Sequence, residues 1–218
     1  MRLIDREALR RVRHRAVAAL SAAIALALSA AALHAALPHD FDTSGRTSLA
    51  GLLLIASPDM RPPFDHAVVL MAQHNRDGAL GIVINQPLDR RPIAGLLKTL
   101  GVDADGITAS VRVFRGGPVG RSTGFVLHSA DYRCPDTVTI DSQIALSDAA
   151  AALRDIGLGK GPRKSLVAFG YAGWAPSQLE DELAQGAWVT APLDVALVFD
   201  DDRAKVWTDA LALRKTER

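Results

Sequence analysis

HAVVLMAQHNRDGALGIVIN, residues 66–85, contains two β-rich apolar runs joined by a short polar connector that ends in Asp-Gly. Gly78 accepts the positive φ that a tight turn demands, so residues 66–74 and 79–85 are predicted to form an antiparallel hairpin. The continuous apolar run LAGLLLIAS, residues 49–57, is ended by Pro58 and predicts a third, buried strand. We expect these three strands to pair as one antiparallel set.

Beyond the hairpin, helical and extended patterns alternate. The apolar residues between Pro92 and Leu100 recur with helical period, and Gly101 lies just past their end. Ser147 is the predicted cap of a second helix that runs through Ile156. Further strands are predicted at residues 111–115, 123–129, 165–170 and 193–199, and further helices at 176–185 and 203–214. This order predicts a single compact α+β domain over residues 48–218, with a mixed, largely antiparallel β-sheet flanked by helices.

The composition argues against several classes of protein. The chain has 218 residues, of which 49% are apolar, enough for one domain with a sizeable core plus an appendage. Residues 1–15 hold six of the 25 basic residues and two of the 24 acidic residues. The chain beyond residue 15 therefore has 19 basic and 22 acidic residues, a net charge of −3. A weakly acidic body is a poor scaffold for phosphate-driven nucleic-acid binding, which uses a clustered basic face, so direct nucleic-acid binding is not expected. Cys134 is the only cysteine, which excludes an intramolecular disulfide and any multi-cysteine metal site.

Residues 1–47 precede the predicted domain and differ from it in character. Residues 16–37 carry no charge and follow an arginine cluster, the layout of a signal peptide or an N-terminal membrane anchor. This apolar helix would be the chain's membrane contact and would place the domain on the periplasmic side. Two alternatives remain open: a poorly inserting alanine-rich helix, or a start codon further downstream that would leave the protein cytoplasmic. Residues 38–47 are typical of a polar linker.

Four stretches of the predicted domain share an order and spacing that are hard to reach by chance. They are LAGLLLIASPDM with HAVVLMAQHNRDGALGIVINQPL, FRGGPVGRSTGFVLHS, GYAGWAPSQLEDEL, and AWVTAPLDVALVFD. In these stretches the chain resembles the AlgH/YqgE family of bacterial proteins. The resemblance implies a soluble, mostly cytoplasmic α+β protein without an established enzymatic activity, and some members have been linked to transcriptional control of exopolysaccharide production. The N-terminal extension is unusual for that family, and Cys134 lies in a variable stretch, so no family role is attached to it.

The first candidate site is a glycine-rich stretch, formed by Arg115, Gly116, Gly117, Pro118, Val119 and Gly120. Its successive small residues would let backbone N–H groups approach a ligand, and Arg115 with Arg121 would neutralise an anion. The alternative, which we favour, is a turn whose glycines allow close backbone packing. The stretch is neither a P-loop nor a dinucleotide fingerprint, because both the Lys-Ser/Thr ending and the G-x-G-x-x-G spacing are missing.

The second candidate pairs His128 with Ser129 near the end of a predicted strand. Adjacent side chains on a strand point to opposite faces, so these two residues by themselves form no nucleophile and base pair. The G-x-S-x-G nucleophile elbow is also missing. His128 would serve as a lone acid, base or anion contact, or, as we favour, as a hydrogen-bonded histidine of the fold.

The third candidate is formed by Gly170, Tyr171, Ala172, Gly173, Trp174 and Pro176. Here a strand is predicted to end in a sharp turn before a helix, which would expose helix N–H groups beside two aromatic side chains. These residues would bind a ligand or a partner chain. The alternative is that Tyr171 and Trp174 wedge the helix onto the sheet.

The remaining polar residues give no pattern typical of a metal, cofactor or catalytic site. His66, His74, Asp77 and Asp131 follow no recognised ligand spacing, and surface solvation is expected for them. Glu180, Asp181 and Glu182 are expected on the exposed face of a helix.

The leading hypothesis is therefore a non-enzymatic binding or regulatory protein that recognises an unknown protein or a small anionic ligand at the glycine-rich loops. The rival is an enzyme whose site unites Arg115, the glycine-rich stretch, His128 and the Tyr171–Trp174 turn in one open pocket.

Overall fold

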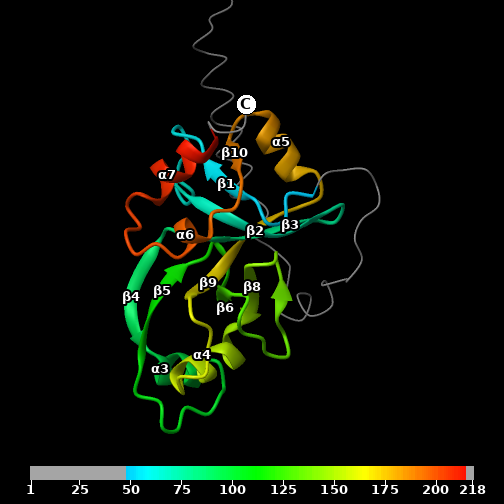
Figure 1. Ribbon diagram of the computed structural model, residues 1–218. Helices are drawn as coiled ribbons and strands as arrows, with labels where there is room; N and C mark the ends of the chain where they lie inside the picture. Colours follow the sequence, from blue (N-terminus) through cyan, green and yellow to red (C-terminus); the bar gives the residue numbers. More distant parts are fainter. Residues whose placement is uncertain (1–47, 215–218) are drawn as a thin grey trace, which may run out of the picture. The chain divides into compact units, whose positions relative to one another are not determined.

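The computed structural model describes residues 48–214, which form a mixed α+β unit (Figure 1). The expected apolar helix at residues 16–37, with the rest of residues 1–47, lies outside the described residues. Within residues 48–214, no helix is both long and apolar enough to span a membrane.

Ten strands of the described chain form one hydrogen-bonded sheet. The strands are β1 (Leu53–Ala56), β2 (Val68–Asn75), β3 (Gly78–Val83), β4 (Pro87–Pro92), β5 (Ser110–Arg115), β6 (Val119–Ser129), β7 (Val138–Thr139), β8 (Ile144–Asp148), β9 (Ser165–Trp174) and β10 (Trp188–Ala191). The predicted hairpin is confirmed as β2 and β3, and β1 pairs antiparallel with β2 as expected. The turn residue Gly78 has a φ of 131°, in the region that favours glycine.

The long strand β9 belongs to both halves of the sheet. Its residues 172–174 pair with β3 and complete the half ordered β10-β1-β2-β3-β9. Its residues 167–169 lie between β5 and β6, in the half that continues through β8 to β7 and, on the other side, through β5 to β4. Among the described strand pairs, β5 with β9 is parallel and the others are antiparallel. The sheet is thus mixed and largely antiparallel, as predicted.

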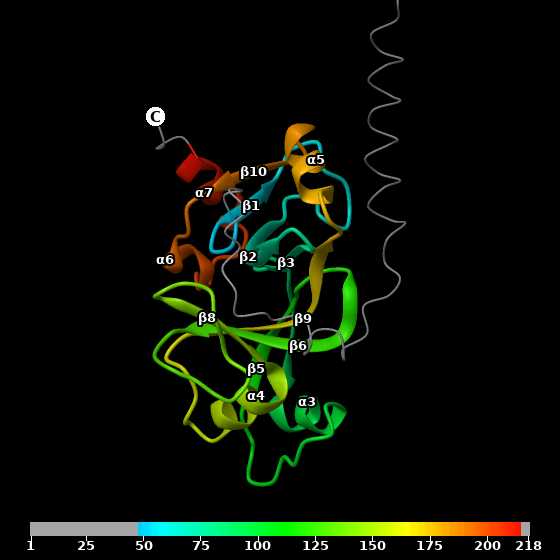
Figure 2. The same cartoon turned by 90° about the vertical axis from the view of Figure 1, so that its right-hand side faces the viewer.

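Helices cover the two halves separately. Those described are α3 (Ile93–Thr99), α4 (Ala149–Gly157), α5 (Gln178–Ala184), α6 (Val195–Val198) and α7 (Val206–Leu213). Figures 1 and 2 show α3 and α4 side by side at the end formed by β5, β6 and β8, and α5 and α7 beside β1 and β10. Helices therefore pack against both halves of the sheet.

Two apolar clusters pack three of these helices, α3, α4 and α5, against the sheet. Under α3 and α4 the buried residues are Ile93, Leu97, Ile107, Val126, Tyr132, Ala149, Ala152, Leu153 and Val167. Beside α5 they are Leu54, Ala56, Ala67, Val69, Met71, Val83, Ala172, Trp174, Leu179, Ala187 and Trp188. All four residues of β1 are fully buried, which explains why this strand reads as an uninterrupted apolar run.

The strand predicted at residues 193–199 is wrong. The strand of this region is β10, which pairs with β1 and is followed by Pro192. Because proline has no N–H to donate to a ladder, it favours the end of a strand. Asp194 then accepts hydrogen bonds from the N–H groups of Ala196 and Leu197 and starts the short helix α6.

The predicted cap of α4 is also wrong by one residue. Asp148, not Ser147, accepts the N–H of Ala150 at 2.7 Å. Ser147 is instead a buried residue of β8, and its hydroxyl is engaged by His128. Both residue types cap helices well, so local preference did not distinguish them.

Candidate functional site

The glycine-rich stretch after β5 packs backbone against backbone with β9. The N–H of Gly116 donates to the carbonyl of Phe169 at 2.9 Å, and the carbonyl of Gly116 accepts the N–H of Val83 at 2.8 Å. A Cβ on Gly117 would overlap the carbonyl of Tyr171. The Gly116 N–H therefore has a protein partner and is not available to an anion, and the glycines allow β3, β5 and β9 to meet.

The predicted turn at Gly170–Trp174 is wrong, because β9 runs on through Trp174 and α5 begins only at Gln178. Gly170 bends the strand with a φ of 77° where it passes from one half of the sheet to the other. Pairing of Ala172 and Trp174 with β3 keeps the chain extended beyond the bend. The N-terminal N–H groups of a helix consequently do not lie directly after Tyr171.

Tyr171 lies where the glycine-rich stretch meets β9, directly opposite Val119 of β6. Positions that a Cβ would take on Gly120 and Gly173 lie 3.0 Å and 3.2 Å from opposite edges of its ring. The ring also makes an edge contact with Phe125, at 6.1 Å between centroids. Only 6% of Tyr171 is exposed, and burial raises the pKa of its hydroxyl. Within residues 48–214 this hydroxyl makes no hydrogen bond.

We call the surface around this ring the Tyr171 notch and define it by Gly120, Arg121, Tyr171 and Gly173. Gly120, Arg121 and Gly173 are exposed. Arg115 is also exposed, but it pairs with Phe169 of β9 and therefore points to the α4 side of the sheet, away from Phe125 and the Tyr171 ring. Two of the three candidate groups are therefore neighbours in the fold, and the notch combines an unpartnered hydroxyl with the exposed Arg121.

Trp174 points away from this surface into the core beside α5. Its indole N–H donates to Glu182 Oε2 at 2.9 Å, and the indole of Trp188 donates to the same oxygen at 2.8 Å. The two rings meet edge to face at 5.8 Å, and Glu182 Oε1 accepts from Gln178 at 2.9 Å. The expectation that Glu182 faces solvent is wrong, because two buried indole donors require an acceptor there.

His128 does not reach the Tyr171 notch. It pairs with Ser165 at the other end of β9, six residues from Tyr171, which corresponds to ~20 Å along a strand. Its side chain is fully buried, and the ring packs edge to face on Tyr132 at 5.2 Å. The structure does not form the pocket that would unite His128 with the two glycine-rich segments.

Both ring nitrogens of His128 have partners. Nδ1 lies 2.9 Å from the carbonyl oxygen of Ser129, which only accepts, so Nδ1 carries the proton. Nε2 lies 2.8 Å from Ser147 Oγ, which must then donate to it. Burial is the main cause that holds the pKa of His128 below its ordinary value, so the ring is neutral at pH 7.

The hydrogen-bonded chain continues from Ser147 into residues that sequence reasoning did not single out. Thr137 Oγ1 lies 2.8 Å from Ser147 Oγ and accepts the N–H of Cys134 at 2.8 Å. Ser147 and His128 have the separation of a nucleophile and its base, but Ser147 is 1% exposed, so a substrate has no path to it. The group satisfies buried polar atoms beneath α4 instead.

Ser129 points to the opposite face from His128, as expected for adjacent residues of a strand. The Ser129 hydroxyl donates a hydrogen bond to Asp131. The same hydroxyl oxygen accepts the N–H of Lys164 at 3.1 Å. Asp131 also pairs with Arg163 at 3.2 Å. The hydrogen bond from Ser129 is the main cause that lowers the pKa of Asp131. Ser129 thus ties two loops together, far from the Tyr171 notch.

The AlgH-like family model matches residues 53–217 of this chain. This chain belongs to the AlgH-like family. A UPF0301 protein of Methylococcus capsulatus is 39% identical over 168 residues, covering 77% of this chain and 92% of that protein. One from Afipia carboxidovorans is 41% identical over 184 residues, covering 80% and 88%.

Two solved structures resemble this AlgH-like protein. The solution structure of AlgH from Pseudomonas aeruginosa has a TM-score of 0.63 and 34% identity, and the match covers 82% of this chain and 98% of that one. The crystal structure of protein DIP2367 from Corynebacterium diphtheriae has a TM-score of 0.59 at 20% identity, covering 81% and 90%, and indicates a shared fold.

The described residues of this AlgH-like protein include no group of three potential metal ligands. His66 is exposed and lies against the ring of Trp207, at 4.4 Å between centroids. The expected solvation of His74 is wrong, because its side chain is only 8% exposed. His74 Nδ1 accepts the N–H of Leu49 at 3.0 Å, and Nε2 lies 3.4 Å from Glu180 Oε1. His74 therefore attaches the segment before β1 to the end of β2.

Proposed function

We propose that this AlgH-like protein is a non-enzymatic binding protein with a regulatory role, and that it recognises its target through the Tyr171 notch. The target is an anionic group, carried by a protein partner or by a small molecule. The role agrees with the AlgH-like family membership and does not require a catalytic group at the notch.

The observation that carries this proposal is the Tyr171 hydroxyl. It makes no hydrogen bond with the described residues, although only 6% of Tyr171 is exposed to solvent. A hydroxyl held in one place by a buried ring is already ordered for binding, so a target pays little conformational entropy to use it. Arg121 supplies a positive charge that favours an anionic target.

A direct DNA-binding role is less well supported than this one. The chain beyond residue 15 has a net charge of −3, whereas phosphate-driven binding uses a clustered basic face. A regulatory effect on transcription would therefore pass through the bound target. We expect no retardation of duplex DNA by the protein at physiological salt.

A photo-crosslinking experiment tests the proposal. A photoreactive phenylalanine derivative at Arg121 is expected to give a discrete adduct in living cells, identified by mass spectrometry. In that background Tyr171→Phe removes only the hydroxyl, and should lower the adduct yield by about twofold to tenfold, the value of one neutral hydrogen bond.

The matched control is the same derivative at Arg76, which lies in the β2–β3 turn with 81% of its side chain exposed. Native mass spectrometry of the isolated protein covers the small-molecule case. The proposal fails if Arg121 and Arg76 give the same adducts, or if neither an adduct nor a bound mass depends on Tyr171.

We also propose that residues 16–37 export or anchor the domain, on the basis of their uncharged run after an arginine cluster. N-terminal sequencing of fractionated native protein tests this. A product that begins near residue 48 in the cytosol would contradict it.

A further inference from the structure

A second basic surface lies on the ribbon formed by β4 and β5, on the opposite face from Arg115. Arg90 of β4 stands directly opposite Arg112 of β5. Directly opposed side chains of antiparallel strands share a face and lie about 5 Å apart at Cβ, and like charges placed so are destabilising. Both residues are exposed.

A third guanidinium reaches the same face from the segment before α7. Phe114 lies two residues from Arg112 on β5 and therefore on the same face. The guanidinium carbon of Arg203 lies 4.9 Å from the centroid of the Phe114 ring. Arg203 Nη1 donates to the carbonyls of Val198 at 2.8 Å and Ile84 at 3.4 Å, which hold the half-buried side chain in place.

These three arginines have no carboxylate within ion-pair distance among residues 48–214. Arg90 donates only to the carbonyl of Ser110, at 3.0 Å, and Arg112 makes no hydrogen bond there. Arg203 Nε is buried without a partner. By contrast, Arg91 points to the other face of β4 and pairs with Asp89 at 3.6 Å.

We propose that Arg90, Arg112 and Arg203 form a binding site for the phosphate group of a small molecule. Three guanidinium groups on one face match the several acceptor oxygens and the multiple negative charge of a phosphate monoester or diphosphate. Phe114 and the two carbonyls fix Arg203, so this donor is ordered before the ligand arrives. The bound anion removes the repulsion between Arg90 and Arg112.

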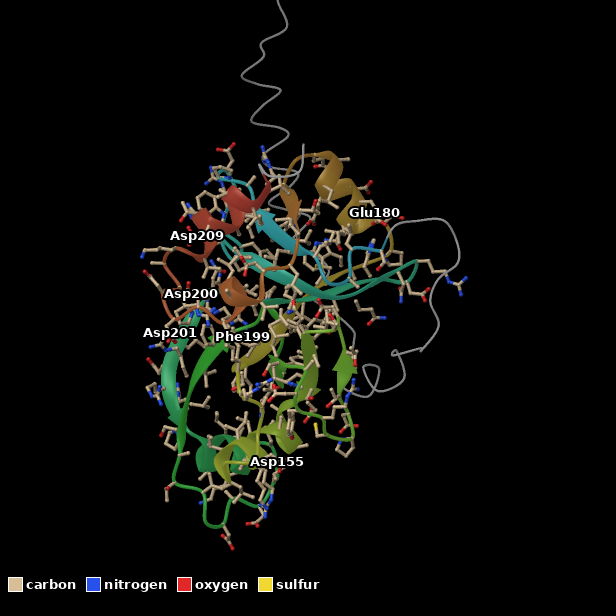
Figure 3. All side chains as sticks on the ribbon, in the orientation of Figure 1. Asp155, Glu180, Phe199, Asp200, Asp201 and Asp209 are labelled. Carbon is tan, nitrogen blue, oxygen red and sulfur yellow. The ribbon has the colours of Figure 1, made fainter. Side chains whose placement is uncertain are left out.

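Two carboxylates beside the site limit its affinity. Figure 3 shows Asp200 and Asp201 next to each other on the segment after α6, and both act on the charge of Arg203. Burial is the main cause that lowers the pKa of Arg203, while the charges of Asp200 and Asp201 raise it and that of Arg112 lowers it. Asp200 accepts the N–H of Asp202 at 2.8 Å, whereas no hydrogen bond to the Asp201 side chain is formed within residues 48–214. Asp201 is therefore the residue to change.

Calorimetric titration of the full chain with sodium pyrophosphate, at constant ionic strength, tests the proposal. We expect saturable binding at one site. Arg112→Ala should weaken it about tenfold to hundredfold, the value of one charge-assisted hydrogen bond. Asp201→Asn should tighten it, because it removes a negative charge next to the anion.

Arg76→Ala is the matched control, since it removes an exposed arginine from the β2–β3 turn and should leave the affinity unchanged. Without pyrophosphate, Arg112→Ala should keep or raise the melting temperature, because it removes a like-charge pair. The proposal is overturned if pyrophosphate does not saturate, if Arg76→Ala weakens binding as much as Arg112→Ala, or if Asp201→Asn weakens it. This site is separate from the Tyr171 notch, so either proposal can fail alone.

Discussion

His128 and Tyr171 are both largely buried, but only His128 has hydrogen-bond partners for its polar side-chain atoms. Ser129 and Ser147 satisfy both nitrogens of His128, so the ring belongs to the interior under α4. The Tyr171 hydroxyl makes no hydrogen bond with the described residues, and the ring that carries it lies between two exposed glycines. A buried group that is fully paired stabilises the fold, whereas an ordered, unpaired group at the surface is suited to binding.

The buried state of His128 predicts how stability changes with pH. Its pKa in the folded protein is below the ordinary value of 6.5, so the unfolded chain takes up a proton that the folded chain does not. Stability should therefore be complete above about pH 6.5 and fall as the pH drops below it, by up to about 1.4 kcal/mol per pH unit. Urea unfolding of the wild type between pH 7.5 and pH 5 measures this slope.

His128→Gln keeps an acceptor for Ser147 but does not titrate, so its slope over that range should be flatter than that of the wild type. Gln143→Ala, an exposed position without a titrating group, is the control and should keep the wild-type slope. Equal slopes in the wild type and His128→Gln would contradict the attribution of this pH dependence to His128. The pKa of Asp131 is also lowered, but this carboxyl affects stability only when the pH falls below its ordinary pKa of 3.8, which lies outside the measured range.

At the scale of the element, β9 connects the two halves of the sheet through a single bend. Gly170 provides this bend, and a Cβ there would lie 2.5 Å from the carbonyl oxygen of Gly117. The Tyr171 notch depends on the bend, because it brings the glycine-rich stretch against Tyr171. The position of the candidate site is thus a consequence of how one strand changes partners.

Gly170→Ala should destabilise the protein by about 3 kcal/mol or more, because alanine is strained at this φ and its Cβ meets backbone. Urea unfolding measures the loss. Gly95→Ala is the control: Gly95 lies in α3 with open space around it, and alanine should stabilise the helix by roughly 0.5–1 kcal/mol. A small effect of Gly170→Ala would mean that β9 does not need the bend.

At the scale of the whole described unit, long-range contacts tie the last helices to the first strands. The indole of Trp207 in α7 donates to the carbonyl of Ala56 at the end of β1, at 2.9 Å. Arg203 contacts the carbonyl of Ile84, just past β3. With β9 common to both halves, neither half can complete its pairing alone.

We therefore expect a single cooperative unfolding transition. Trp174, Trp188 and Trp207 all lie on the side of β1, β3 and β10, so tryptophan fluorescence reports on that half. Far-UV circular dichroism includes α3, α4 and the strands of the other half. The two urea curves should have the same midpoint. Two separated midpoints would show that the halves fold independently.

The sequence by itself determined the β2–β3 hairpin, the helix α3, the α+β class and the family, because turn chemistry and apolar period act over a few residues. It did not place Glu182 under two indoles, extend β9 through Trp174, or bring His128 to Ser147. Those features join residues that are distant in the chain: 19 positions separate His128 from Ser147, and 119 separate Arg203 from Ile84. Only tertiary packing decides which buried donors and acceptors meet, since local preference leaves several partners equally favourable.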